Sequence, residues 1–191
     1  MKKIFITAFT FIVSTCLAQF TDVLQIPSSH FKASIKNEYT TLENQLSSTY
    51  TDKIGAPQLP TYQKSYALPA GSIVSNISYV TSGKTLLGNN YYLYPSQPAC
   101  MLNGKPCPDF VAPDAAIYNS ATPYPQEIGT VSSDASFFGY HIVKLNICPF
   151  EYIPNARQLY YFNQVTINIQ YSIGPIEYTA RITENRAKIT I

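Results

Sequence analysis

The chain has 191 residues, of which 46% are hydrophobic and only 13% are charged. One domain takes roughly 100–200 residues, and this apolar content excludes a wholly disordered chain. With 13 basic and 11 acidic side chains and no basic run, the sequence argues against nucleic acid as a partner. Tyr (16), Phe (10) and Pro (14) are abundant, which favours short strands and turns over helices.

The first segment has the organisation of a secretory signal peptide. Lys2 and Lys3 form a positive n-region, Ile4 to Leu17 is apolar, and Ala18 follows as a small residue. We therefore expect a signal peptide over residues 1–18, cleavage after Ala18 and a secreted mature chain. The alternative is a lipoprotein in which Cys16 is lipidated. A membrane-spanning helix needs about 20 apolar residues, and neither this run nor any later stretch meets that requirement, so we expect no membrane span.

Export leaves three cysteines, Cys100, Cys107 and Cys148. The first two flank a segment in which Asn103-Gly104 can reverse the chain. Disulfides are typical of oxidising compartments, so we predict a Cys100–Cys107 disulfide, with two reduced surface thiols as the alternative. We expect Cys148 to be a buried and unreactive thiol, because free cysteine often behaves as a small hydrophobic residue.

Signals for secondary structure are weak before Lys53. Within residues 19–52, a segment that we take as part of the domain, residues 28–46 could form a short helix or a strand and loop. Beyond it, strands are expected over residues 72–80 and 91–94. Residues 95–125 contain seven prolines and form a long irregular stretch, a kind of segment that is uncommon and often functional.

The strongest signals are two alternating segments near the C-terminus. Residues 139–148 and 165–173 place apolar side chains on one face without a break, and residues 176–182 alternate again after a Gly-Pro turn. This period of two predicts strands of a sheet with one solvated face. We therefore expect one all-β domain over residues 53–182, an antiparallel β-sandwich or jelly roll, followed by a tail or linker over residues 183–191.

The sequence offers little catalytic chemistry. His141 and Cys148 lie seven residues apart on one predicted strand, hence on opposite faces and about 23 Å apart at the usual rise of a strand. They cannot form a dyad, and we expect His141 to be a core or interface histidine and His30 to be solvated. No motif for a zinc, calcium, phosphate or serine-hydrolase site occurs. We therefore expect no enzyme activity, no metal and no cofactor.

The order of several short motifs resembles the N-terminal propeptide of gingipain-type cysteine peptidases. Gly55–Pro60 resembles a G-x-P-x-L-P segment of that family, and Leu93–Pro98 resembles its P-x-Q-P segment. The remaining matching pieces are Ala67–Ser72 with Ile77, Asp114, Tyr118, Tyr124-Pro125, Gly139-Tyr140, Pro149–Pro154, Leu159 and Val165–Tyr171. Together they cover about Gly55 to Tyr171, most of the mature chain.

The resemblance implies a β-sandwich pro-domain, exported by the type IX route, that keeps a cysteine peptidase latent and helps it to fold. The sequence stops at Ile191, so we expect the catalytic domain that is its partner to lie outside this chain, in cis or in trans. The Cys100–Cys107 pair departs from what the family leads us to expect. The alternatives are a secreted binding or adhesion module and an accessory domain that tethers a larger protein.

Two sets of residues are candidates for the pro-domain's function. In the first, the loop closed by Cys100 and Cys107 enters the substrate cleft, with Lys105 in the specificity pocket of the peptidase. Pro106 follows Lys105, and a Lys-Pro bond is a poor scissile bond because Pro lacks the N–H and constrains its neighbour. In the second, Arg181 and Arg186 are processing sites, since they lie beyond the last strongly patterned strand, where exposed chain is readily cleaved.

Overall fold

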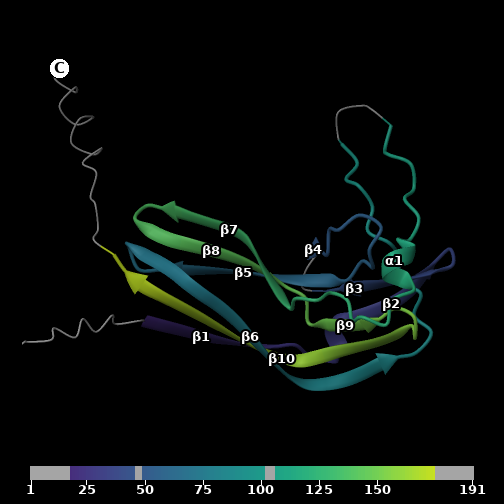
Figure 1. Ribbon diagram of the computed structural model, residues 1–191, viewed down its shortest axis with the longest axis horizontal. Helices are drawn as coiled ribbons and strands as arrows, with labels where there is room; N and C mark the ends of the chain where they lie inside the picture. Colours follow the sequence, from purple (N-terminus) through teal and green to yellow (C-terminus); the bar gives the residue numbers. More distant parts are fainter. Residues whose placement is uncertain (1–17, 46–48, 102–105, 175–191) are drawn as a thin grey trace, which may run out of the picture.

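The computed structural model describes residues 18–45, 49–101 and 106–174, and the regular secondary structure of this part of the chain is almost entirely β (Figure 1). A 3-10 turn covers Ser28–His30, and one short helix, α1, covers Ala115–Tyr118. The predicted all-β, antiparallel fold is confirmed. The strands are β1 (Ala18–Gln25), β2 (Phe31–Lys36), β3 (Tyr39–Asn44), β4 (Thr49–Tyr50), β5 (Pro60–Leu68), β6 (Ser72–Gly88), β7 (Gly129–Phe137), β8 (Tyr140–Ile147), β9 (Phe150–Ile153) and β10 (Gln158–Ile173).

Two four-stranded sheets and one hairpin make up this architecture. The first sheet has β10 at its centre, with β6 along one edge and β9 and β1 in turn along the other. The second sheet has the order β4-β5-β8-β7, and β2 pairs with β3 as a separate hairpin. Every pairing between named strands is antiparallel.

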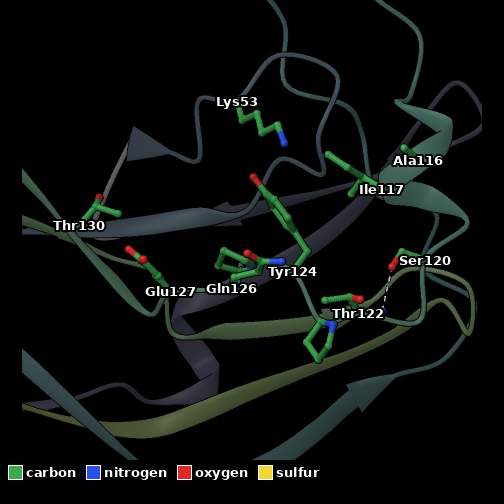
Figure 2. Close-up of a pocket in the computed structure, with 11 residues that line it drawn as sticks. Lys53, Ala116, Ile117, Ser120, Thr122, Tyr124, Gln126, Glu127 and Thr130 are labelled. Atoms are coloured by element: carbon green, nitrogen blue, oxygen red, sulfur yellow. Dashed lines mark hydrogen bonds between the residues drawn. The ribbon is translucent and has the colours of Figure 1, made fainter.

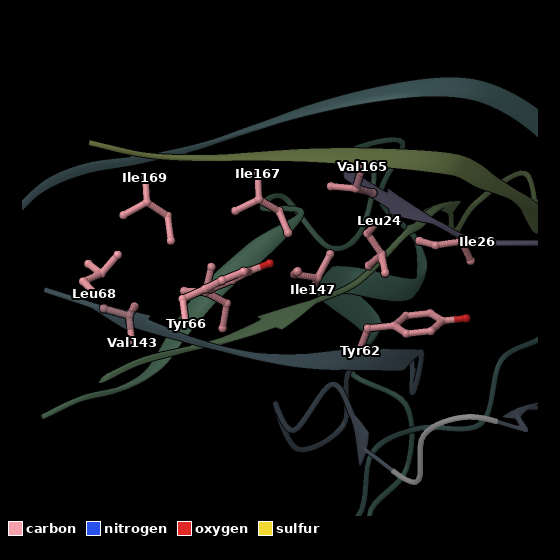
Figure 3. Close-up of a cluster of buried hydrophobic side chains, with 11 residues drawn as sticks. Leu24, Ile26, Tyr62, Tyr66, Leu68, Val143, Ile147, Val165, Ile167 and Ile169 are labelled. Atoms are coloured by element: carbon pink, nitrogen blue, oxygen red, sulfur yellow. The ribbon is translucent and has the colours of Figure 1, made fainter. Parts of the chain in front are cut away.

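The main core lies between the two sheets (Figure 3). Val165, Ile167 and Ile169 of β10 are fully buried, and they face Val143 and Ile147 of β8 in one hydrophobic cluster (Figure 3). These are the inward positions that the alternation in the sequence predicts. Fully burying such a side chain contributes about 1.5–3 kcal/mol, so this alternation positions the two sheets against each other.

A second core lies at the end of the sandwich that carries α1. Its buried members include Leu59, Leu93, Phe150 and Leu159. Phe31 packs against both cores, and its ring centroid is 4.7 Å from that of Phe150. The two cores are therefore continuous, with β10 contributing residues to each.

The N-terminal segment is built of strands. Residues 28–46, for which the sequence left helix and strand open, form the 3-10 turn and the β2–β3 hairpin up to Asn44. β1 pairs with β10 over its whole length, from Ala18 opposite Tyr171 to Gln25 opposite Gln164. Tyr66 of β5 donates a hydrogen bond to Asp22 of β1 at 2.8 Å. β1 therefore completes the first sheet, and its Leu24 belongs to the main core.

The expected strand over residues 91–94 was wrong, and the expected strand over residues 72–80 was too short. β6 continues to Gly88, because β10 is long enough to pair with it from Ser72 onward. Residues 91–94 form only an isolated parallel bridge between Leu93 and Thr40. Asn90, with φ 64°, turns the chain just before this segment, and Pro95 follows it. Few residues remain between Asn90 and Pro95, so the pairing of this segment cannot extend into a ladder of hydrogen bonds.

Cys148 lies in the second core and is 4% exposed, as predicted. Burial raises the pKa of its thiol to about 12, although a backbone hydrogen bond at Phe150 acts in the opposite direction. The thiolate is the reactive form of cysteine. At pH 8 the folded protein therefore holds Cys148 as the neutral thiol.

We predict that Cys148 is not alkylated in the folded protein at pH 8. Peptide mapping by mass spectrometry after a timed pulse of iodoacetamide measures the labelled fraction of Cys148. Labelling becomes complete only when urea unfolds the chain. Rapid labelling without denaturant would contradict the burial described above.

Candidate functional site

The predicted disulfide is present, and it closes an exposed arm. We call the segment from Gln97 to Val111 the arm; the structure describes it on both sides of residues 102–105. Cys100 and Cys107 are bridged, with their Cα atoms 4.8 Å apart. The arm projects from the sandwich beside α1 (Figure 1), and its residues on either side of the disulfide are exposed, with Met101 68% exposed. A covalently closed segment therefore stands out from the body of the domain.

A side-chain clamp holds the two stems of the arm together below the disulfide. The side-chain amide of Gln97 donates to the carbonyl of Val111 at 2.9 Å, and its oxygen accepts from the Val111 N–H at 2.8 Å. The same amide nitrogen donates to the carbonyl of Pro95 at 3.0 Å. Because one side chain satisfies both backbone groups of the opposite stem, the stems keep one register without forming a sheet ladder.

The root of the arm is tied to the segment that begins at Gly55. Gly55 N–H donates to the Ser96 carbonyl, and Ser96 N–H donates to the Ala56 carbonyl, at 2.9 and 2.8 Å. Gly55 has φ +78°, a conformation that residues with a side chain rarely adopt. Ser96 is 2% exposed, and its hydroxyl donates to the Thr51 carbonyl at 2.7 Å. A buried hydrogen-bond network therefore fixes where the first stem leaves the body.

The second stem is fixed at Asp114. Its N–H donates to the Gly55 carbonyl at 2.9 Å. Its carboxylate accepts from Ala116 N–H at 2.9 Å and so caps α1. Gly55 therefore receives both stems, through Ser96 on one side and Asp114 on the other.

An aromatic cluster supports the arm from the side. We use this name for Tyr39, Tyr92, Tyr94, Phe110 and Tyr118. Tyr39 stacks on Tyr92 at 5.0 Å between ring centroids and contacts Phe110 of the arm at 5.9 Å. Tyr94 contacts Phe110 at 5.9 Å, and Tyr92 contacts Tyr118 of α1 at 5.6 Å. Such contacts contribute about 0.5–1.5 kcal/mol each beyond burial, so the cluster fastens the arm at Phe110.

Burial acts on the pKa of two phenols of this cluster, those of Tyr118 and Tyr39. It raises the pKa of Tyr118, whose hydroxyl donates to the Leu93 carbonyl at 2.8 Å. It also raises the pKa of Tyr39, with Glu38 acting in the same direction. A neutral phenol can donate a hydrogen bond, and the Tyr118 hydroxyl is already engaged by Leu93. The Tyr118 phenol therefore serves as a structural support of the cluster.

The other residues predicted for a site are dispersed. Cys100, Pro106 and Cys107 lie on the arm and are exposed, whereas Lys105 lies outside the described residues. Ala18 is the first residue of β1, and in Figure 1 this strand extends toward the end of the fold opposite to α1. Arg181 and Arg186 also lie outside the described residues. Of the predicted site residues that the structure describes, those of the arm therefore lie together, and Ala18 lies apart from them.

His141 binds structural partners. Its Nδ1 lies 2.7 Å from the carbonyl oxygen of Ser72, and its Nε2 contacts the carboxylate of Asp134. His30 lies in the 3-10 turn, with its Nδ1 3.5 Å from the hydroxyl of Tyr62. Within residues 18–45, 49–101 and 106–174, no group of three His, Cys, Asp or Glu side chains could hold a metal ion.

A hollow of about 410 Å³ lies beside α1 (Figure 2). Ile117, Tyr124 and Lys53 line one part of it, and Glu127 and Thr130 line another (Figure 2). Ser120, which also lines it, accepts a hydrogen bond from the Thr122 N–H at 2.9 Å. Lys53 and Glu127 form no ion pair in the described structure. Glu127 is the one carboxylate among the lining residues, and no His or Cys lines the hollow.

Sequence reasoning missed the root, and although it noted the run of tyrosines at residues 91–94, it did not connect them with Tyr39, Phe110 and Tyr118. It treated residues 95–125 as one irregular stretch, and it treated Tyr91–Tyr94 as a strand. The signal that could have found the root is the pairing of two segments rich in Pro, Gly55–Pro60 and Leu93–Pro98. The structure joins them through the Pro57–Pro95 bridge and through Gln58 N–H donating to the Tyr94 carbonyl at 2.8 Å.

Comparison with known proteins agrees with this architecture. A search of curated protein sequences finds no match. Among solved structures, gingipain K from Porphyromonas gingivalis, solved to explain its zymogenic latency, matches with a TM-score of 0.66 at 19% identity; the match covers 85% of this chain and 96% of that one. The complex of the pro- and mature domains of RgpB, also from Porphyromonas gingivalis, matches with a TM-score of 0.62 at 14% identity over 92% and 93% of the two chains.

At these identities the structural matches show a shared fold. The family model named Propeptide_C25 matches residues 25–188, which is most of the chain and includes the arm, its root and every strand from β2 to β10. The resemblance found in the sequence is therefore confirmed, and the chain belongs to the Propeptide_C25 family, the pro-domains of gingipain-type cysteine peptidases.

Proposed function

We propose that this domain keeps a gingipain-type cysteine peptidase latent and helps it to fold, by docking on the catalytic domain in cis or in trans. The observation that carries the proposal is the arm, which a disulfide and a side-chain clamp hold on a buried root. A peptide-like inhibitor binds more tightly when it is already ordered, because less conformational freedom is lost on binding. The described stems of the arm meet that requirement. Family membership favours the latency function over a binding or adhesion module.

The domain itself would contribute no peptidase chemistry. Cys148 is buried as a neutral thiol, and both ring nitrogens of His141 face structural partners. The substrate cleft and the nucleophile would belong to the partner. The similar gingipain K structure concerns zymogenic latency, and the similar RgpB structure is a complex of pro- and mature domains. Both support the same role for this domain.

We further propose that the domain is exported by the signal peptide of residues 1–18, with cleavage after Ala18, and follows the type IX route. Gln19, the first residue of the mature chain, would pair with Gln170 at the start of β1. Cleavage there would leave the rest of β1 in the sheet. The described residues contain no helix long and apolar enough to cross a membrane.

The first prediction concerns Lys105. We expect the arm to place Lys105 in the specificity pocket, where its charge meets carboxylates. Removing one partner of a buried charge pair costs about 2–5 kcal/mol, so Lys105→Ala should raise the inhibition constant at least about 30-fold. The measurement is a titration of Arg- and Lys-specific gingipain-type peptidases. Lys144→Ala, which removes an outward side chain of β8, is the matched control.

An unchanged inhibition constant for Lys105→Ala would remove this residue from the mechanism. Failure of the folded wild-type domain to inhibit any peptidase of the panel would overturn the proposed function itself.

The second prediction concerns the disulfide. Replacing Cys100 and Cys107 with Ser together should weaken binding about tenfold, because the freed arm loses more conformational freedom when it docks. The melting temperature should fall by only a few degrees, since the arm is exposed and both cores stay intact. Binding is measured without reductant, by calorimetry against a peptidase whose nucleophile has been substituted. Equal affinity of the double variant and the wild type would exclude the closed arm from the contact.

The third prediction concerns maturation. The chain has three arginines, Arg157, Arg181 and Arg186, and we propose the last two as release sites. N-terminal sequencing and intact mass after incubation with an Arg-specific peptidase should place the first cuts after Arg181 or Arg186. Arg157, whose backbone is held in the β9–β10 turn, is the internal control and should stay uncut. A first cut elsewhere would dismiss the proposed sites.

A further inference from the structure

A small polar pocket lies beside the aromatic cluster and shares no lining residue with the hollow of Figure 2. Its volume is about 260 Å³, and Tyr92, Tyr118, Asn119, Pro154, Asn155 and Arg157 line it. Tyr92 and Tyr118 belong to the cluster that supports the arm, and Arg157 comes from the turn between β9 and β10. The pocket therefore opens at the same end of the sandwich as the arm.

Arg157 has a backbone conformation that side-chain-bearing residues rarely adopt. Its φ is 51°, in the left-handed region where glycine and asparagine are favoured. The surrounding turn is fixed, because Tyr91 N–H donates to the Arg157 carbonyl at 3.0 Å and Asn155 N–H donates to the Ser120 carbonyl at 3.1 Å. A residue kept in an unfavourable conformation suggests that its side chain serves a function.

The guanidinium of Arg157 is held in place but has no acidic partner among the described residues. Its Cζ lies 4.6 Å from the centroid of the Tyr92 ring. The ion pairs of the described residues are Lys84–Glu151 and Asp134–His141, and neither includes Arg157. A guanidinium over an aromatic face keeps its N–H donors directed outward, in the fork geometry that matches a carboxylate.

The positive charge of Arg157 also acts on the pKa of a buried phenol, that of Tyr152. Burial raises the pKa of Tyr152 to about 12, and Arg157 acts in the opposite direction. The hydroxyl of Tyr152 donates to the Tyr91 carbonyl at 2.6 Å, and that of Tyr118 donates to the Leu93 carbonyl. Both phenols are therefore engaged with the backbone, and Arg157 is the charged group of the pocket that can receive an anion.

We propose that this pocket receives an Asp or Glu side chain of the peptidase domain, with Arg157 binding its carboxylate. This inference rests on the proposed function. The guanidinium of Arg157, without an acidic partner among the described residues, is complementary in charge and geometry to a carboxylate, which among side chains only Asp and Glu supply. The Arg157 pocket would then be a second anchor beside the arm, fixing the angle at which the domain docks.

The first test probes the pocket without the peptidase. Nitrogen-15 NMR of the full chain follows the Arg157 Nε–H signal and the side-chain amides of Asn119 and Asn155. N-acetylglutamate N-methylamide should shift these signals with a saturable dependence, and the glutamine analogue of the same size should not. Arg157→Gly should abolish the effect. Lys36→Gln should preserve it, because Lys36 lies over Tyr94 at 5.0 Å but does not line the pocket.

Equal shifts from the acid and the amide would overturn the proposal, as would shifts that persist in Arg157→Gly. The carboxylate that binds could come from a side chain or from a chain terminus. N-acetylglycine, which carries only a main-chain carboxylate, distinguishes these two sources. If it binds more tightly than the glutamate compound, the pocket recognises a chain terminus, and the proposed Asp or Glu side chain is the wrong ligand.

The second test measures affinity for the nucleophile-substituted peptidase. Arg157→Gly should weaken binding at least about tenfold, and Arg157→Lys should have an intermediate effect, because a lysine keeps the charge but not the fork. The melting temperature of Arg157→Gly should not fall appreciably, since glycine adopts this φ without strain. Lys36→Gln, the control for a cation over a tyrosine ring, should bind within about twofold of the wild type.

The two proposals can fail separately. Tight binding by the wild type with an unchanged affinity for Arg157→Gly would overturn the anchor and leave the latency function intact. Absence of binding by the wild type would overturn the latency function, and the NMR titration would still decide whether the pocket binds a carboxylate.

Discussion

Strand β10 belongs to both hydrophobic cores, and the position of every functional element follows from that constraint. Its inward residues Val165, Ile167 and Ile169 fill the main core, and Leu159 fills the second. Along its edges it pairs with β6 on one side and with β9 and β1 on the other. A shift of β10 by one residue would turn all of these side chains outward. The register of this one strand therefore couples the sandwich to the end that carries the arm.

The second core turns this end of the fold into a platform for the arm. Leu59 and Leu93 are both buried there, and each stands in a segment that continues into the root. Hydrophobic burial brings the two stretches of backbone together, and hydrogen bonds around Gly55 then fix the direction of the arm. Farther out, the side chain of Gln97 bridges the stems and the disulfide closes the exposed part. Each step removes conformational freedom from the arm before it meets a partner.

Much of the sandwich could be predicted from the sequence, because one solvated face imposes a period of two. Strand β8 and the part of β10 over residues 165–173 follow from that local rule. The burial of Cys148 follows instead from the apolar character of a free thiol. The disulfide follows from two cysteines that flank a turn. These features depend on neighbours in the sequence, and so they are visible in it.

The features that escaped prediction depend on contacts between distant segments. Tyr91–Tyr94 has the aromatic and apolar residue types of a short strand, but a parallel bridge to Thr40 and the proline after it decide its structure. Arg157 gives no sign in the sequence that its φ is positive; only the turn, with Tyr91 and Pro154 bonded to its backbone, imposes that conformation. The same turn places a cation over Tyr92 without an acidic partner among the described residues. The site of greatest functional interest thus arises from tertiary contacts, whereas the sandwich that supports it arises from local pattern.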